Sequence, residues 1–191
     1  MGKKTKRIVI AFGLGFAVIV LILAAATWRY PFSGISFHQS ITYKPDKDFI
    51  NTYLQDIKSF KQFYDKQDKR DDVTTDRLQY VLETYEKPWL TSSKPMNITR
   101  DKLDMIDMQL RQTSHSLIEL GFTQNYHDEA RKYLKLMLMD FLAVQDQVEH
   151  LKHATNDSRK VLKLQMRNLQ MTMASNFDHM VTFYKLYKNA K

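Results

Sequence analysis

The longest apolar stretch in the chain extends from Ile8 to Thr27 and contains no charged residue. As a helix it would rise about 1.5 Å per residue and reach roughly 30 Å, which matches the hydrocarbon core of a bilayer. Trp28 and Tyr30 follow it, and aromatic residues of this kind are enriched at membrane interfaces. The pattern predicts a transmembrane helix with an aromatic anchor at its C-terminal end.

The charges on the two sides of this stretch predict its orientation. Four basic residues and no acid stand just before it: Lys3, Lys4, Lys6 and Arg7. Arg29 is the single basic residue just after it. Because basic residues accumulate on the cytoplasmic side, we expect a cytoplasmic N-terminus over residues 1–7 and a signal-anchor over 8–29. The rest of the chain would then lie outside the cytoplasm at the cell membrane.

A cleavable secretory signal is the alternative interpretation of the same segment. The small residues Ala24–Ala26 offer a cleavage site after Ala26, although the apolar stretch exceeds the usual signal core of about 7 to 15 residues. Gly13 and Ala17 are one helical turn apart, and this spacing of small residues lets two membrane helices approach closely. Weak dimerisation through Gly13 and Ala17 is therefore a further expectation.

After the span, residues 30–44 are expected to form an extended connector. Pro31 ends the membrane helix, because proline cannot continue the hydrogen-bonding pattern. Apolar positions then alternate with polar ones in the pattern of extended chain: Ile35, Phe37, Ile41 and Tyr43.

In the remainder of the chain, apolar residues recur at steps of three and four, the pattern of amphipathic helices. Five helices are expected, over residues 45–70, about 75–87, 99–121, 123–153 and about 159–191. Thr99 is placed to cap the third helix, Gly121 to end it and Thr123 to open the fourth. Pro88 should end the second helix, which leaves residues 87–99 as a loop.

The expected fold class is all-α, with an N-terminal transmembrane helix followed by an antiparallel bundle of about five helices over residues 45–191. Steps of three and four favour shallow packing angles, and the connections are short. The segment Tyr133–Val144 is apolar on nearly every side, as in helices buried on most faces. It is therefore predicted to be the central helix of the bundle, with Phe141 in its core.

Composition excludes several classes of function. The chain has no cysteine, which rules out disulfides, thiolate zinc sites and thiol catalysis. Its formal net charge is +8, but five of the basic residues flank the span, which leaves 24 basic against 21 acidic residues in the rest. Such a balance, on the far side of a membrane, argues against a nucleic-acid partner.

The last predicted helix concentrates positive charge. From Arg159 onwards there are seven basic residues and one acid, Asp178. Four basic residues lie within about two turns and are candidates for binding an anionic surface: Arg159, Lys160, Lys163 and Arg167. A solvated face, or pairing with the acidic segment Asp46–Glu86 inside the domain, would explain the same charges.

Methionine is abundant in the last three predicted helices. Methionines on the apolar seams, such as Met137 and Met173, are expected to fill the core. Met105, Met108 and Met171 fall off the seams, so they are candidates for an adaptable surface that binds a partner. A cluster of exported methionines that binds soft Cu(I) is the alternative.

Other candidate ligands have simpler explanations in helical terms. His150 and His153 lie one turn apart but on the side away from the seam, so a solvated pair is expected. Asp101, Asp104 and Asp107 form an acidic edge that suits the N-terminal half of a helix. The zinc, di-iron, phosphate-loop, dinucleotide, EF-hand and nucleophile-elbow motifs are absent from the sequence, so no catalytic residue, metal or cofactor is expected.

The function expected from these observations is a non-catalytic binding or scaffold role at the cell envelope, performed by a membrane-anchored extracytoplasmic helical bundle. Its partner would be a protein or an anionic envelope surface. The alternative is a sensor-like bundle that holds an apolar small molecule or a soft metal.

Overall fold

The structure is a computed structural model, and it describes residues 3–67 and 72–190. Within these residues the chain forms seven helices and two short strands. The protein is mostly helical, as predicted: 77% of its residues lie in helices and 5% in strands.

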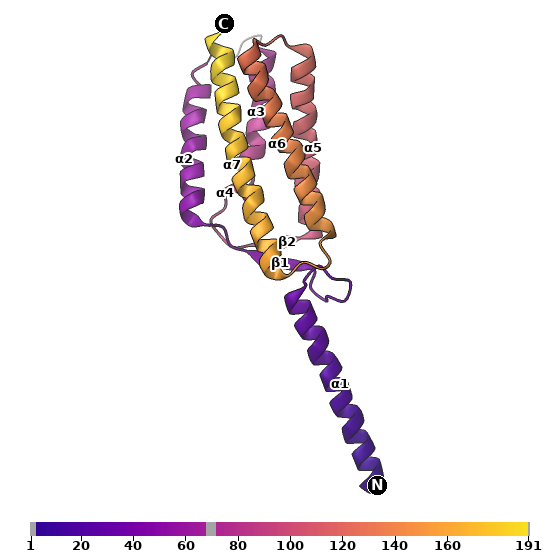
Figure 1. The fold of residues 1–191 in the computed structure, drawn as a ribbon. Coiled ribbons are helices and arrows are strands. Elements are labelled where there is room, and N and C mark those ends of the chain that lie inside the picture. The colour runs from indigo at the N-terminus through magenta and orange to yellow at the C-terminus, as the bar shows by residue number, and fades with distance from the viewer. Residues whose placement is uncertain (1–2, 68–71, 191) are drawn as a thin grey trace.

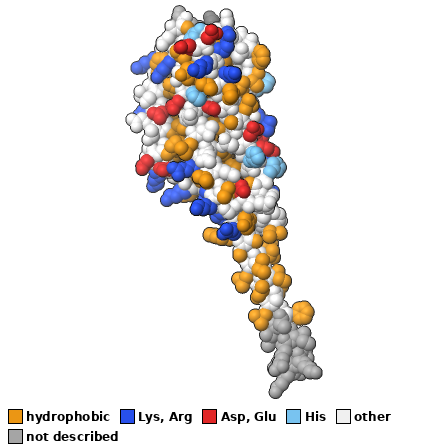
Figure 2. Space-filling model, viewed as in Figure 1, with side chains coloured by type: hydrophobic (Ala, Val, Ile, Leu, Met, Phe, Trp, Pro, Cys, Tyr) orange, Lys and Arg blue, Asp and Glu red, His pale blue; other side chains and the backbone are white. Residues whose placement is uncertain are grey.

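The first helix, α1 (Lys3–Arg29), projects away from the remaining elements (Figure 1). Its segment Phe12–Arg29 is long and apolar enough to cross a membrane, and none of it is buried against the rest of the chain. Figure 2 shows apolar side chains along this projecting helix. The same length and composition also suit a signal sequence. Gly13 and Ala17 lie on this exposed helix, and dimerisation through them stays a prediction.

The next helix, α2 (Lys47–Tyr64), begins after Asp46, whose side chain accepts hydrogen bonds from the backbone N–H groups of Asp48 and Phe49. It starts two residues later than predicted and ends before residue 70, the expected last position, which lies outside the described residues. The predicted stripe is buried throughout: Ile50, Tyr53, Ile57, Phe60 and Tyr64. The helix α3 (Val73–Tyr85) follows, capped by Asp72.

The segment between residues 87 and 99 is not the loop that the sequence predicted. Pro88 does not end α3, which already ends at Tyr85. It is instead the first residue of a short helix, α4 (Pro88–Thr91), a position where a backbone N–H would form no hydrogen bond within the helix. The strand β2 (Met96–Thr99) follows and pairs antiparallel with β1 (Ser40–Tyr43). Residues 40–43 of the predicted connector therefore form a strand of the domain, with Ile41 buried opposite Ile98.

The two long helices that follow correct a predicted boundary. Thr99 caps α5 (Arg100–Thr123) as predicted, by accepting from the backbone N–H of Lys102. Gly121 does not end this helix, because it adopts helical geometry against the Leu134 side chain. Thr123 closes α5 instead of opening the next helix. That helix, α6 (Asp128–His153), is capped by the His127 ring.

The last helix, α7 (Arg159–Asn189), is capped by Ser158 and packs against α6, β1 and α3. Figure 1 shows α5, α6 and α7 side by side, with successive helices running in opposite directions. The rings of α7 contact those of α2 and α3, since Phe177 meets Phe60 and Tyr85. The prediction that α6 is buried on most faces is wrong: Phe141 is fully buried, but Met139 and Leu142 are 54% and 44% exposed. The helix does pack between α5 and α7.

Candidate functional site

The four predicted basic residues lie in the first turns of α7, at the end of the domain from which α1 projects. Leu162 and Met166 of the same turns are fully buried. Helical periodicity therefore directs Lys160, Lys163 and Arg167 outward, and all three are exposed. Lys and Arg side chains gather on this end of the domain in Figure 2. We call Arg159, Lys160, Lys163 and Arg167 the basic row.

Arg159 joins the basic row to the end of α1. Its Nε donates a hydrogen bond to the Trp28 carbonyl oxygen at 3.0 Å, and its guanidinium carbon lies 5.1 Å from the centre of the Trp28 ring. Both contacts are typical of arginine, whose planar cation stacks on aromatic faces. The start of α7 is thus held at the point where the apolar helix ends.

The other members of the row keep their charge available. In the part of the chain that the structure describes, Lys160, Lys163 and Arg167 form no ion pair. Pairing with the acidic segment occurs at the opposite end of α7, where Lys188 Nζ lies 2.6 Å from Asp72 Oδ2. The alternative that the acidic segment neutralises the whole basic helix therefore fails for the row itself.

Buried hydrogen bonds fix the base of α7 against the strands. The Tyr43 hydroxyl donates to Gln170 Oε1 at 2.7 Å, and Gln170 Nε2 donates to the Trp89 carbonyl at 2.7 Å. Burial raises the pKa of Tyr43, and the positive charge of Arg167 partly opposes this effect. The phenol therefore stays a neutral donor, and the two hydrogen bonds hold α7 against β1 and α4.

A loop beside α1 completes this end of the domain. Phe32 is fully buried, but Ile35 and Phe37 are 57% and 78% exposed. A groove of about 490 Å³ lies between the loop and the last turns of α1, and both Phe37 and Trp28 line it. The alternating pattern of the sequence predicted the same role for Ile35 and Phe37 as for the buried Ile41 and Tyr43. A signal that could have separated them is the Ser33-Gly34 pair, which favours a turn there.

The three off-seam methionines are exposed as predicted but do not form one surface. Met105, Met108 and Met171 are 56%, 53% and 50% exposed. Met105 lines an apolar groove with Trp89 and β2, whereas Met171 lines a separate, more polar groove between α6 and α7. A shared partner surface made of all three is therefore not supported by their positions.

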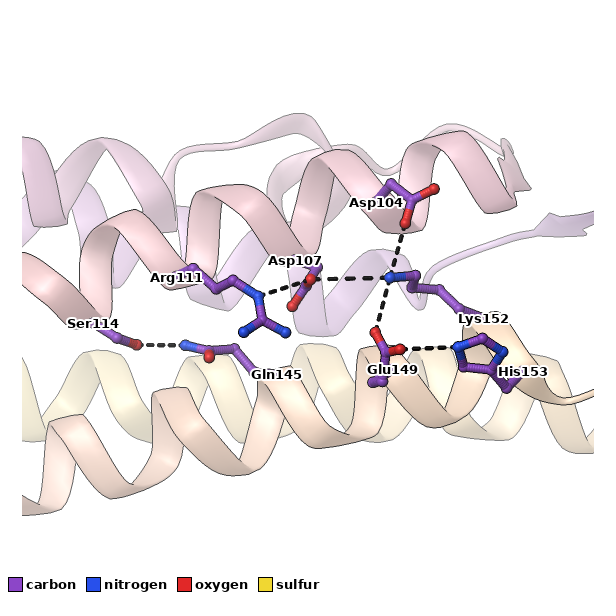
Figure 3. A network of polar contacts seen from close by, with 8 residues as sticks. All are labelled: Asp104, Asp107, Arg111, Ser114, Gln145, Glu149, Lys152 and His153. Carbon is purple, nitrogen blue, oxygen red and sulfur yellow. Dashed lines mark hydrogen bonds and ion pairs between the residues drawn. The ribbon is translucent and has the colours of Figure 1, made fainter.

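Two residues of the acidic edge, Asp104 and Asp107, and one of the histidine pair, His153, belong to a charge network between α5 and α6, shown in Figure 3. Lys152 Nζ lies 2.8 Å from carboxylate oxygens of both Asp104 and Glu149. Asp107 pairs with Arg111 at 3.0 Å, and Glu149 also contacts the exposed His153. Hydrogen bonds to Asp104 and Glu149 raise the pKa of Lys152. These carboxylates are occupied by cations, and no group of metal-ligating side chains gathers among the described residues.

One polar cluster inside the core was missed because its members come from three helices. Asn176 is fully buried, and its Oδ1 accepts from the Tyr85 hydroxyl. Its Nδ2 donates to the Met137 carbonyl at 2.8 Å and to Asp140 Oδ2 at 3.3 Å. Asp140 also bonds His179 Nδ1 at 3.0 Å. The cluster satisfies the Tyr85 hydroxyl and the Asn176 side chain where α3, α6 and α7 meet.

Comparison of the chain with known protein families, curated proteins and solved structures finds no match.

Proposed function

We propose that this protein is a membrane-anchored binding module, in which α1 crosses the membrane with its N-terminus in the cytoplasm. The helices after it form an antiparallel bundle outside the cytoplasm, at the cell envelope. The module binds an anionic surface through the basic row and has a scaffold role without catalysis. The observation that carries the proposal is the position of Lys160, Lys163 and Arg167 beside the end of α1, to which Arg159 is bonded. These three residues are exposed and have no acidic partner among the described residues.

The expected strength of this attraction suits a tethered domain. A basic side chain near an anionic membrane contributes about 1 kcal/mol, and the effect falls off within a Debye length of about 10 Å at 0.1 M salt. Three free cations therefore give a weak and salt-sensitive affinity. Tethering by α1 raises the local concentration, so weak binding is sufficient to hold the domain against the surface.

Vesicle binding tests the role of the basic row. The fragment 30–191 is mixed with vesicles of rising anionic lipid content at low and high salt, with circular dichroism as the check on folding. The triple variant Lys160→Glu, Lys163→Glu, Arg167→Glu should lose the salt-sensitive binding. A control with the same change in charge, Lys58→Glu, Lys132→Glu, Lys135→Glu, should retain most of it. Equal binding by the two variants would contradict the proposal.

The membrane anchor needs a separate test. Sequencing the N-terminus of the protein isolated from membranes should find α1 still attached. A mature chain that begins at Thr27 would show that α1 is a cleaved signal and would leave the domain without an anchor. Crosslinking in native membranes would then show whether a protein partner occupies the module.

The second candidate function, binding of a small apolar molecule, is favoured by one groove. Trp89, Met96, Ile98 and Met105 line a largely apolar hollow of about 220 Å³ between α4, β2 and α5. Native mass spectrometry of the purified protein would detect a retained molecule. Met105→Lys, which places a charge in the groove, should abolish its retention if this function is correct.

A further inference from the structure

The loop that joins α1 to β1 displays large apolar side chains at its surface. Ile35 and Phe37 are 57% and 78% exposed, and the neighbouring Trp28 is 72% exposed. Single exposed apolar residues are common on protein surfaces, but a group of three at one point marks an interaction site. Figure 1 shows this loop beside the end of α1.

The loop is held in this conformation by contacts on its inner side. Phe32 is fully buried, its carbonyl accepts from Arg100 Nη2 at 2.6 Å, and the Arg100 guanidinium carbon lies 5.7 Å from the centre of its ring. The Ser36 hydroxyl donates to the His38 carbonyl at 3.1 Å, and Ser36 N donates to Ser33 O at 3.1 Å. With these bonds satisfied, the chain presents Ile35 and Phe37 outward while Phe32 points into the core.

The position of the loop along the axis of α1 indicates which environment its apolar side chains contact. Phe37 and His38 share a groove with Val20, Leu23 and Ala24 of α1, all inside the apolar segment Phe12–Arg29. At about 1.5 Å per residue, Ala24 lies about 7.5 Å and Val20 about 13.5 Å along the helix from Arg29. Apolar side chains of interfacial segments enter a bilayer by about 5–10 Å, and the level of Ala24 lies within this range.

We propose that Ile35 and Phe37 insert into the outer leaflet of the same bilayer that α1 crosses, so that the loop is a second, interfacial membrane anchor. This inference rests on the proposed crossing by α1 but not on the basic row. Lipid acyl chains occupy the groove between the loop and α1. Trp28 and Arg159 lie at its rim, where an aromatic ring and an arginine head are both favourable at the level of the headgroups.

The absence of cysteine permits a direct measurement of depth, because single cysteines can be labelled without background. Phe37→Cys is labelled with a nitroxide in the full chain, reconstituted in phosphatidylcholine vesicles that contain no anionic lipid. Ala24→Cys in α1 is the reference for a site in lipid. Phe122→Cys is the matched reference for water, because Phe122 is 89% exposed on α5 at the opposite end of the domain.

Spin relaxation by oxygen, which concentrates in lipid, is compared with relaxation by a water-soluble nickel complex. The oxygen-to-nickel ratio at position 37 should shift from the value at position 122 to near the value at position 24. A ratio at 37 equal to that at 122, with 24 in lipid, would overturn the inference and leave the crossing by α1 intact. Exclusion of both reagents at 37 would assign the site to a protein partner and overturn it as well. A water-like ratio at 24 would overturn the crossing itself, and the inference with it.

Discussion

The hydroxyl of Tyr85 should contribute to stability far more than that of its neighbour Tyr80, although both belong to α3. Tyr85 is fully buried and donates to Asn176 Oδ1, whereas Tyr80 is 56% exposed. Tyr85→Phe leaves the amide oxygen of Asn176 buried without its donor. An unsatisfied buried acceptor costs about 1–3 kcal/mol, while loss of a solvated hydroxyl costs less than about 0.5 kcal/mol.

A double variant separates the hydrogen bond from loss of packing. When Asn176→Leu is added to Tyr85→Phe, both polar partners are gone and the penalty for an unpaired group disappears. The free-energy cost of the double variant should therefore fall short of the sum of the two single costs, by about 1 kcal/mol or more.

The assay is urea unfolding of the fragment 30–191, followed by circular dichroism, with Tyr80→Phe as the matched control. The midpoint should shift for Tyr85→Phe with the slope unchanged, which indicates a change in stability alone. Equal costs for Tyr85→Phe and Tyr80→Phe, or strict additivity in the double variant, would refute the buried network.

Three further predictions concern the core, the paired strands and the stability of the domain at low pH. Phe141→Ala should cost about 3–5 kcal/mol in urea unfolding because Phe141 is fully buried, and a loss below about 1 kcal/mol would contradict this. A fragment that begins at Lys44 should melt at lower temperature than the fragment 30–191, because it lacks β1 and the buried Ile41; equal melting would contradict the role of the strands. Burial acts to raise the pKa of Asp72, but hydrogen bonds, led by that from Lys188, hold it well below its usual range. The stability that Asp72 contributes should therefore be fully present above the unfolded pKa of about 3.9 and be lost as the pH falls through the lower pKa of the folded state. In Asp72→Asn, the free energy of unfolding should accordingly fall less steeply with decreasing pH in this range.

Helical periodicity was sufficient to predict most of the core. The stripe of α2 and the cap of α5 at Thr99 follow from local rules, since side-chain spacing and capping involve residues within a few positions of each other. Gly121 shows the limit of these local rules. Glycine often ends a helix, but α5 continues through Gly121 because the helix packs against α6 there. The apolar surface of α6 likewise led to a wrong prediction of burial on most faces, because Met139 and Leu142 are apolar but exposed.

The site was predictable in charge but not in geometry. The spacing of Lys160, Lys163 and Arg167 places them together on one face of a helix. The contact between Arg159 and Trp28 joins residues far apart in the sequence, which no local pattern reveals. The strands β1 and β2 contain four residues each, too few for alternation alone to identify them against helix and loop.

The paired strands also determine how motion passes between α1 and the domain. β1 follows the loop that leaves α1, and β2 leads directly into α5. The pairing of β1 with β2, from Ser40 opposite Thr99 to Tyr43 opposite Met96, therefore connects the loop after α1 to the start of α5. Arg159 adds a second point of attachment at the start of α7. A single flexible tether would let the domain swivel freely, but two separated attachments resist torsion. Rotation of α1 about its own axis would therefore turn α5 and α7 with it, and the azimuth of the domain would follow that of the helix.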